Sequence, residues 1–294
     1  MFYRRKVILA LTQLLGGKIE KNRIQKLLFL YTQRKRNAEY DFVPYKFGCY
    51  SFSAKADLET MIKNESFLLI DDCYVKNSTI DYVKGLKVDD QKILKDVVRL
   101  YGNMSRDSLV KHIYINFPYY ATKSAILNDV LVGEQLLQVL KLKTDKNDKI
   151  LFTIGYEGIS LEKYLNKLIT NDIKLLVDVR KNPLSMKFGF SKSLLKKYCQ
   201  SLDINYLHIP EVGINSDQRQ ELNEQQDYDN LFDIYKKTTL LETKSHQETI
   251  INLLLSHDRI ALTCFEADIC RCHRKPLAEA IEKNPIFDYQ IKHI

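Results

Sequence analysis

The second half of the chain alternates short apolar runs with stretches of helical periodicity, and this alternation constrains the fold more than any other feature. The runs "KILFTIGY", "IKLLVDVR" and "RIALTC" are nearly continuous in apolar character, which is typical of parallel strands covered on both faces. A further strand is expected at "INYLHIP". Helices are expected between the strands, at "SLEKYLNKLIT", "FSKSLLKKYCQSLD", "LFDIYKKTTLLETKSHQETIINLLLSH" and "KPLAEAIEKN". The pattern predicts an α/β fold whose mostly parallel sheet carries helices on both faces.

The first half reads as mainly helical. Helices are expected near Arg5–Leu15, Asn22–Lys35, Asp89–Tyr101 and Ser105–Tyr114, together with one that Ser53 caps. With the strand-like piece "SFLLIDDCYVKN", these predict a smaller, mainly α-helical, winged-helix-like domain. The charged segment "KLKTDKNDK" has no regularly spaced apolar residues and separates the two halves of the chain. We therefore expect two domains, residues 1–146 and 147–294.

Nothing in the sequence indicates a membrane or disulfide-rich protein. Its apolar runs are shorter than the roughly 18–20 residues that span a bilayer, and the apolar residues of "MFYRRKVILALTQLLGGK" recur at helical spacing, as in an amphipathic first helix. The six cysteines are scattered except for a late cluster. Cys49, Cys73 and Cys199 are therefore expected to be small buried hydrophobes. We expect a cytoplasmic location and no membrane partner.

The net charge of +8 is concentrated at the front of the chain. Residues 1–50 carry 11 Lys or Arg against 3 Asp or Glu, whereas residues 151–294 carry 19 against 20. A basic helical front with aromatic residues among its charges suits an anionic partner, nucleic acid first. The residues that we expect to contact nucleic acid or a protein partner are Arg34, Lys35, Arg36 and Lys46. A solvated helix face explains the same charges equally well.

Polar and reactive residues follow each expected strand of the second half. They are Tyr156 and Glu157, then Asp178 and Arg180, then His208, and finally Cys264, Glu266, Cys272, His273 and Arg274. Because ligands of open parallel sheets bind beyond the carboxyl ends of the strands, these residues are expected at one edge. The convergence predicts an active site in the second domain.

The individual residues leave alternatives open. Gly155 and Gly158 bracket a turn that either presents N–H groups to an anion or is a plain tight turn. Asp178 and Arg180 face the same side of a strand, so they either form a structural ion pair or hold a polar substrate. His208 is either a general base or a structural residue.

The stretch "LTCFEADICRCHRKPLAEAI" holds three of the six cysteines. A zinc interpretation would use Cys264, Cys270, Cys272 and His273, but their spacing lacks the usual C-x2-4-C pair. We therefore predict neither a metal nor a cofactor. The preferred interpretation places Cys272 at the start of the last helix, where the helix and neighbouring cations lower its thiol pKa and favour a bound phosphate. Glu266 is then the candidate acid or base.

Two resemblances follow from these motifs. In the front half, "RIQKLLFLYTQ", "YDFVPYKFGCYS" and "YGNMSRDSLVKHIYINFPYY" resemble the signature segments of the Panacea, or SocA-like, antitoxin domain. That resemblance covers about residues 5–125. It implies a non-catalytic module for protein or nucleic-acid contacts. The family's Gly-Pro is Gly48-Cys49 here, so the local turn differs.

In the back half, "TIGYEGISLEKYLNKL", "LLVDVRKNPLSMKFGFSKSLLKKYC", "INYLHIPEVG" and "LTCFEADICRCHRKPLAEAI" resemble the domain of unknown function 488 over about residues 150–285. The positions that this resemblance carries over are Tyr156, Glu157, Asp178, Arg180, Pro183, Ser185, His208, Cys264, Glu266, Cys272, His273 and Arg274. Two departures stand out: Val212-Gly213-Ile214 replaces Leu-Gly-Gly, and Cys270 is additional. The resemblance implies a loose link to DNA repair or modification, but no defined reaction.

We predict an enzyme directed at nucleic acid or nucleotides, of the hydrolase, glycosidase or lyase type, in DNA repair, modification or genome defence. DNA is favoured over RNA as its partner. The expected catalytic residues are Asp178, Glu266, Glu157, Cys272 and His208. The expected substrate- or phosphate-binding residues are Tyr156, Gly155, Gly158, Arg180, Ser185, Cys264, His273 and Arg274. The alternatives are a non-catalytic nucleotide sensor or antitoxin-like regulator, and thiol chemistry on Cys264 or Cys272.

Overall fold

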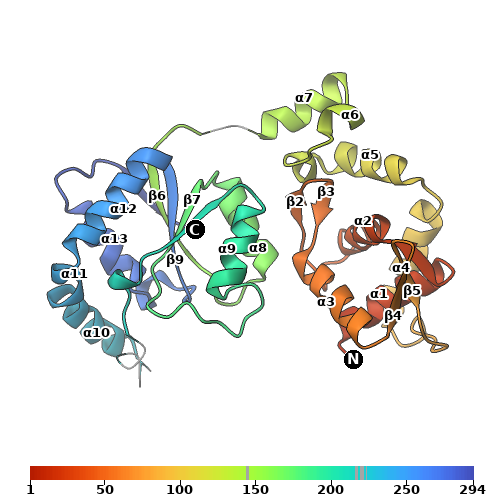
Figure 1. The fold of residues 1–294 in the computed structure, drawn as a ribbon, viewed down its shortest axis with the longest axis horizontal. Helices are drawn as coiled ribbons and strands as arrows, with labels where there is room; N and C mark the ends of the chain where they lie inside the picture. The colour runs from red at the N-terminus through yellow and green to blue at the C-terminus, as the bar shows by residue number, and fades with distance from the viewer. Residues whose placement is uncertain (144–145, 216–217, 219–221, 223) are drawn as a thin grey trace. The chain divides into compact units, whose positions relative to one another are not determined.

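The computed structural model describes residues 1–143, 146–215, 218, 222 and 224–294. The chain divides into two compact units, Met1–Thr144 and Asp145–Ile294 (Figure 1). Residues 144 and 145, which belong to the expected linker, lie outside the described residues. Among the helices of the described part, none combines the length and the apolar character that crossing a membrane requires.

The N-terminal unit is rich in helix. Its helices are α1 (Tyr3–Leu14), α2 (Lys21–Thr32), α3 (Phe52–Lys63), α4 (Val88–Tyr101), α5 (Arg106–Asn116), η1 (Pro118–Ala121), α6 (Leu127–Val130) and α7 (Gly133–Leu142). The strand-like piece is a hairpin, β4 (Phe67–Ile70) and β5 (Cys73–Lys76), which β1 (Lys18–Glu20) extends to an antiparallel sheet of order β1-β5-β4. A second hairpin pairs β2 (Val43–Tyr45) with β3 (Gly48–Tyr50).

The start of α3 differs from the prediction. Ser51, not Ser53, is the cap, because its side chain accepts a hydrogen bond from the Ala54 amide at 3.2 Å. Phe52 and Ala54, in the first turn of the helix, are both buried. Ser105 caps α5, accepting a hydrogen bond from the Ser108 amide.

The C-terminal unit is an α/β layer structure around a five-stranded parallel sheet of order β10-β6-β9-β7-β8. Its strands are β6 (Ile150–Gly155), β7 (Leu175–Asp178), β8 (Asn205–His208), β9 (Arg259–Cys264) and β10 (Gln290–His293). Its helices are α8 (Leu161–Thr170), α9 (Lys192–Gln200), η2 (Pro210–Val212), α10 (Gln225–Lys237), α11 (Thr239–Glu242), α12 (Lys244–His257), η4 (Ile269–Arg271) and α13 (Arg274–Glu282). The predicted fold class is confirmed.

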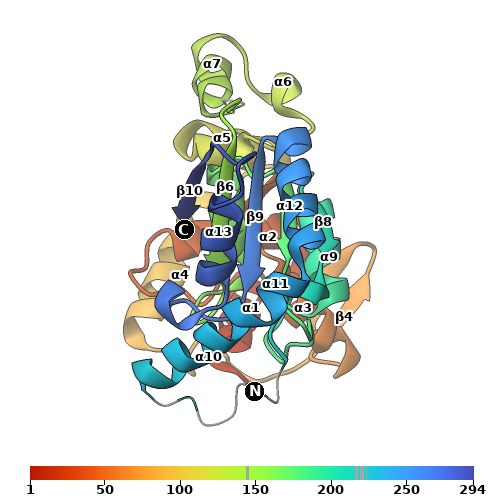
Figure 2. The same ribbon diagram turned by 90° about the vertical axis from the view of Figure 1, so that its left-hand side faces the viewer.

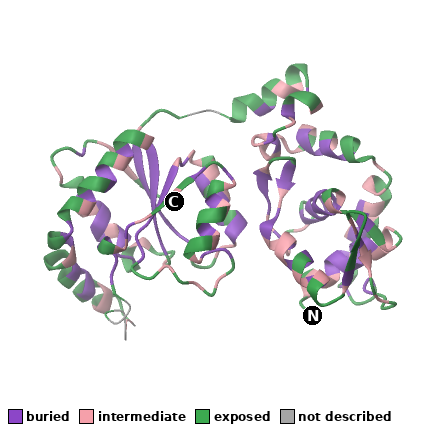
Figure 3. Cartoon of the chain, in the orientation of Figure 1, coloured by how far each residue is buried: buried purple, intermediate pink, exposed green. Residues whose placement is uncertain are grey.

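Helices cover both faces of this sheet. α8 and α9 pack on one face, and α12 and α13 on the other (Figures 1 and 2). Every residue of the central strands β6 and β9 is buried, as their continuous apolar runs predict (Figure 3). The edge strand β10 was not predicted from the sequence, because it is short, largely exposed and polar at three of its four residues.

The topology places a crevice at the carboxyl ends of β6 and β9. From β6 the chain leads through α8 to β7 and then to β8, whereas from β9 it leads through α13 to β10 at the opposite edge. The two neighbouring central strands therefore continue onto opposite faces of the sheet. Such a switch point is where open α/β sheets bind ligands.

Candidate functional site

An ion pair lies buried at the end of β7. The Asp178 carboxylate accepts two hydrogen bonds from the Arg180 guanidinium, from Nε at 2.8 Å and from Nη2 at 2.5 Å. Tyr206 donates to the same carboxylate at 2.6 Å. The side chain of Asp178 is fully buried and that of Arg180 is 5% exposed. Of the two alternatives left open by the sequence, the geometry therefore favours the structural ion pair.

Arg180 also connects β7 to the loop after β6. Its Nη1 donates to the Tyr156 hydroxyl at 2.8 Å and to the Phe190 carbonyl at 2.9 Å. Burial lowers the pKa of Arg180, but the hydrogen bonds and charge of Asp178 outweigh this and hold the guanidinium charged. The Tyr156 ring stacks on Phe190, with ring centres 4.2 Å apart. Tyr156 and Arg180 are thus rigid walls of the site.

His208 and Glu157 lie at the margin of the same edge. His208 Nε2 donates to the Arg180 carbonyl at 2.8 Å, and its Nδ1 lies 3.0 Å from the ammonium of Lys192. Glu157 is exposed and accepts from the Ala267 amide at 3.0 Å. Both side chains hold loops together, His208 at the end of β8 and Glu157 beside the loop after β9.

The turn after β6 is shaped by close backbone contact. The amides of Tyr156 and Glu157 both donate to the Phe265 carbonyl, at 3.1 and 2.9 Å, so neither is directed at an anion. A side chain at Gly155 would meet the Glu266 carbonyl at 1.9 Å, which explains the glycine. Gly158 has φ +72°, a conformation suited to glycine in a tight turn. The plain-turn alternative therefore fits better than the anion-binding one.

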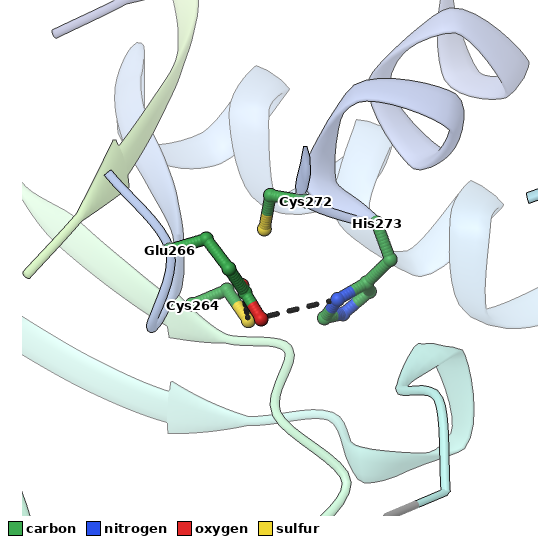
Figure 4. Close-up of side chains that lie close together, drawn as sticks. All are labelled: Cys264, Glu266, Cys272 and His273. Atoms are coloured by element: carbon green, nitrogen blue, oxygen red, sulfur yellow. Dashed lines mark hydrogen bonds between the residues drawn. The ribbon is translucent and has the colours of Figure 1, made fainter. Parts of the chain in front are cut away.

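Four reactive side chains converge between the end of β9 and the start of α13 (Figure 4): Cys264, Glu266, Cys272 and His273, here called the donor cluster. One sulfur, oxygen or nitrogen atom from each lies within 4.8 Å of those of the others. The Cys264 thiol donates to Glu266 Oε2 at 3.1 Å and lies 3.6 Å from His273 Nδ1. Both cysteines and the histidine are buried, and Glu266 is half-buried.

The prediction of a lowered thiol pKa at Cys272 is wrong. Burial raises the pKa of Cys272 well above its usual range, the neighbouring Cys264 and Glu266 raise it further, and Arg274 opposes them. Cys272 also lies just before the helix, with extended backbone, and His273 is the N-cap of α13. Burial thus outweighs the helix terminus, and Cys272 is protonated in this state of the protein.

The donor cluster differs from the four zinc ligands considered from the sequence. Cys270 is exposed, and its Sγ lies 3.7 Å from the ammonium of Lys275, outside the cluster. Glu266 occupies the fourth position instead. The C-x-E spacing at the end of the strand could have indicated Glu266 as a member, since β9 ends at Cys264 and Glu266 follows two residues later.

Arg274 is deeply buried beside this cluster. It is 2% exposed, and a side chain built at Gly155 would lie 2.7 Å from its Nη1. Within the described part of the chain, its Nε and Nη1 have no hydrogen-bond partner. Leaving two nitrogen atoms of a buried cation without acceptors is costly, so the site is electrostatically incomplete. Arg274 does not line the cavity described next, so contact with a substrate phosphate there is not supported.

A cavity of about 330 Å³ opens at the carboxyl ends of β6, β7 and β9. It is here called the strand-end cavity, and its lining residues are Tyr156, Arg180, Lys181, Asn182, Leu184, Ser185, Ile214, Cys264 and Phe265. Lys181 and Asn182 are exposed, and the Phe265 ring is 43% exposed. Cys264 belongs to both the cavity wall and the donor cluster. The sequence reasoning missed Lys181, Asn182 and Phe265, which flank the motif residues that it selected.

The basic residues of the N-terminal unit fall into two groups. Arg34, Arg36 and Lys46 are exposed, and Arg34 stacks over Tyr101 with its guanidinium 5.7 Å from the ring centre. Lys35 instead forms internal ion pairs with Glu39 and, at 2.6 Å, with Asp90. The expectation that Lys35 contacts a partner is therefore not supported, because its charge is used within the fold.

The N-terminal unit also has a basic cavity that the sequence did not indicate. It measures about 500 Å³ and is lined in part by Arg23, Lys26, Arg106 and Lys111. Lys26 is buried and donates to the Cys49 carbonyl at 3.1 Å, and burial lowers its pKa. These side chains come from α2 and from α5, which are separated along the chain, so periodicity alone could not bring them together.

Comparison with known families bears on the C-terminal unit. The family model described as the domain of unknown function DUF488 matches residues 160–281. The match includes β7, β8, β9 and most of α13, with Asp178, Arg180, His208 and the donor cluster. The matched region begins after Tyr156 and Glu157, so these two residues lie outside it. No curated protein is significantly similar to the chain. The resemblance of the back half to DUF488 is supported, and the Panacea resemblance of the front half stays a prediction.

Proposed function

We propose that the C-terminal unit is an enzyme that acts on a nucleotide unit, free or within nucleic acid. The observation that carries this proposal is the position of Cys264, which joins the strand-end cavity to the donor cluster. A substrate in the cavity would therefore meet the Cys264 thiol, and the carboxylate, second thiol and imidazole of the donor cluster each have an atom within 4.8 Å of that thiol. Side chains of this kind perform general acid–base and nucleophilic chemistry.

The cavity lining fits the parts of a nucleotide. The half-exposed Phe265 ring offers a stacking surface for a base, and aromatic stacking is worth about 1–3 kcal/mol per base. Lys181, Asn182 and Ser185 offer a charge and hydrogen bonds to a phosphate or sugar. Since Asp178 is held by Arg180 and Tyr206, Glu266 is the better candidate for the general acid or base.

The exposed cations of the N-terminal unit support a nucleic-acid substrate. Arg34, Arg36 and Lys46 would contribute nonspecific, salt-dependent contacts with the phosphate backbone. A role in DNA repair, modification or genome defence is the biological setting that we propose for such an activity. A cytoplasmic location and a preference for DNA are part of the same proposal.

A direct test measures binding and product formation on the same samples. The full chain is incubated with labelled single- and double-stranded DNA and RNA, and with free nucleotides, across a salt series. We expect binding that weakens with salt and a cleaved strand, released base or altered nucleotide. The variant Glu266→Gln should bind normally and lose about 10²–10⁴-fold in rate. Retention of the full rate in Glu266→Gln would contradict its catalytic role, and failure to bind any of these molecules at low salt would contradict the proposal.

A regulatory function is the second candidate, and the basic cavity of the N-terminal unit favours it. Arg23, Arg106 and Lys111 would there bind an anionic group of a ligand or partner protein. Under this alternative Glu266→Gln leaves function unchanged, whereas Arg106→Ala weakens binding. The two variants therefore distinguish an enzyme from an antitoxin-like regulator.

A further inference from the structure

The donor cluster has the composition and arrangement of a metal site. Two thiols, an imidazole and a carboxylate are the ligand types that zinc uses in proteins. They come from two segments, the end of β9 and the start of α13, which the parallel sheet brings together. In Figure 4 all four side chains point toward a common centre.

The two distances measured from Cys264 Sγ are near those around a tetrahedral ion. Metal–sulfur bonds of about 2.3 Å and metal–nitrogen bonds of about 2.0 Å place ligand atoms roughly 3.3–3.8 Å apart in a tetrahedron. Cys264 Sγ lies 3.1 Å from Glu266 Oε2 and 3.6 Å from His273 Nδ1. All four donor atoms lie within 4.8 Å of one another.

His273 is oriented as metal-binding histidines are. Its Nε2 lies 3.1 Å from the Val179 carbonyl, which can only accept a hydrogen bond, so Nε2 carries the proton. Nδ1 is then the lone-pair nitrogen and faces Cys264. A hydrogen bond from the distal ring nitrogen to a backbone carbonyl is the usual outer-shell support of a histidine ligand.

The charge balance supplies an independent argument. A divalent ion with two thiolates and one carboxylate carries a net charge of −1. Arg274 follows His273 in the chain, interacts electrostatically with Cys272, and within the described residues lacks acceptors for Nε and Nη1. A negative metal centre beside it would compensate this buried positive charge.

We propose that the donor cluster binds a zinc-type divalent ion, with Cys264, Cys272 and His273 as fixed ligands and Glu266 as the fourth. This revises the expectation of no metal. Thiolate and imidazole ligands select zinc and similar transition metals over magnesium or calcium, which prefer oxygen. On binding, two metal–sulfur bonds form and the two thiol protons pass to solvent.

Glu266 is the ligand that water can replace, because it alone of the four is half-exposed. A water molecule on the ion would then lie beside the released carboxylate and near the strand-end cavity. This arrangement of three protein ligands and one exchangeable position is that of a catalytic zinc site. The metal proposal does not depend on which substrate the cavity takes.

The test uses the metal ion alone and the full chain. The protein is prepared under reducing conditions, stripped with a chelator and titrated with Co²⁺, and then with Zn²⁺. We expect one equivalent of Co²⁺ to produce intense thiolate-to-cobalt absorption, which one equivalent of Zn²⁺ removes. Zn²⁺ should also raise the Tm, because an ion that binds the folded state stabilises it.

Cysteine variants locate the site. Cys272→Ser should abolish the thiolate band and the Tm increase, whereas Cys270→Ser is the matched control and should keep both, because Cys270 lies outside the cluster. Glu266→Gln should keep the band, since both sulfurs remain, but weaken Co²⁺ affinity. Because Glu266 is half-exposed, this variant is expected to fold even if Cys272→Ser does not.

Two results would overturn the proposal. One is the lack of a thiolate band and of stoichiometric metal in the reduced wild-type protein. The other is loss of the band in Cys270→Ser, because the ion would then bind a surface cysteine. Neither result depends on the folding of Cys272→Ser, and neither involves the catalytic activity.

Discussion

Replacement of Asp178 by asparagine should destabilise the C-terminal unit rather than abolish a catalytic step. Asp178 is fully buried and receives both hydrogen bonds of the Arg180 fork and one from Tyr206. Asparagine has nearly the same shape but no charge, so Arg180 would stay buried without its anion. Removing one partner of a buried ion pair costs about 3–5 kcal/mol. For a unit of this size, that corresponds to a decrease in Tm of roughly 10 °C.

The assay is urea and thermal unfolding followed by circular dichroism, with the N-terminal unit as an internal reference. A matched control is Asp233→Asn, since Asp233 and Lys236 are exposed and 3.8 Å apart, and such pairs contribute about 0–1 kcal/mol. A second variant, Asp178→Asn with Arg180→Met, should recover part of the loss because no buried charge remains. If Asp178→Asn unfolds like the wild type while activity disappears, Asp178 is catalytic and the structural interpretation is refuted.

Three further predictions concern other residues. Phe265→Ala should weaken nucleotide binding, measured by calorimetry, by about 1–3 kcal/mol because a stacking contact is lost. The control is Phe188→Ala, which removes another exposed ring that does not line the cavity. Burial and the charges of Arg274 and Lys275 lower the pKa of His293, so the unfolded chain binds more protons than the folded protein. The Tm should therefore rise with pH between that lowered pKa and about 6.5, and His293→Gln should flatten this part of the Tm–pH curve. Arg36→Ala should reduce the salt dependence of DNA binding without affecting the Tm. Lys35→Ala should lower the Tm, because Asp90 loses its buried partner, and equal Tm values for the two variants would contradict a structural role of Lys35.

The sequence predicted the C-terminal fold well where burial dominates. β6, β7 and β9 lie within continuous apolar runs, so these strands followed from hydrophobicity, and their parallel arrangement followed from the alternation of strands with helices. β10 was missed because an exposed edge strand carries little of that signal. In the N-terminal unit the helices α1, α2, α4 and α5 were predicted to within a few residues, since their apolar positions recur at helical spacing.

The candidate site was predicted less completely, because side-chain direction and burial do not follow from position along a strand. The residues at the strand ends were identified, but their partners were not. The sequence left open whether Asp178 and Arg180 pair or hold a substrate, and it could not show that the pair would be buried. Nor could it show that His273 would direct Nε2 at the Val179 carbonyl. It also could not show that burial would outweigh the helix terminus at Cys272.

Glu266 and Cys270 show why spacing alone could not identify the members of the donor cluster. Cys270 is only two residues from Cys272, but the η4 turn exposes it to solvent. Glu266 is six residues from Cys272 and two from Cys264. It follows the end of β9, where Gly155 lets its backbone lie against that of β6. Which side chains meet between two neighbouring strands and the following helix therefore depends on how closely the backbones approach. A glycine permits that close approach, and the spacing of cysteines gives no information about it. We therefore expect Gly155→Ala to disturb metal binding without removing a ligand, because the clash with the Glu266 carbonyl displaces Glu266 from the donor cluster.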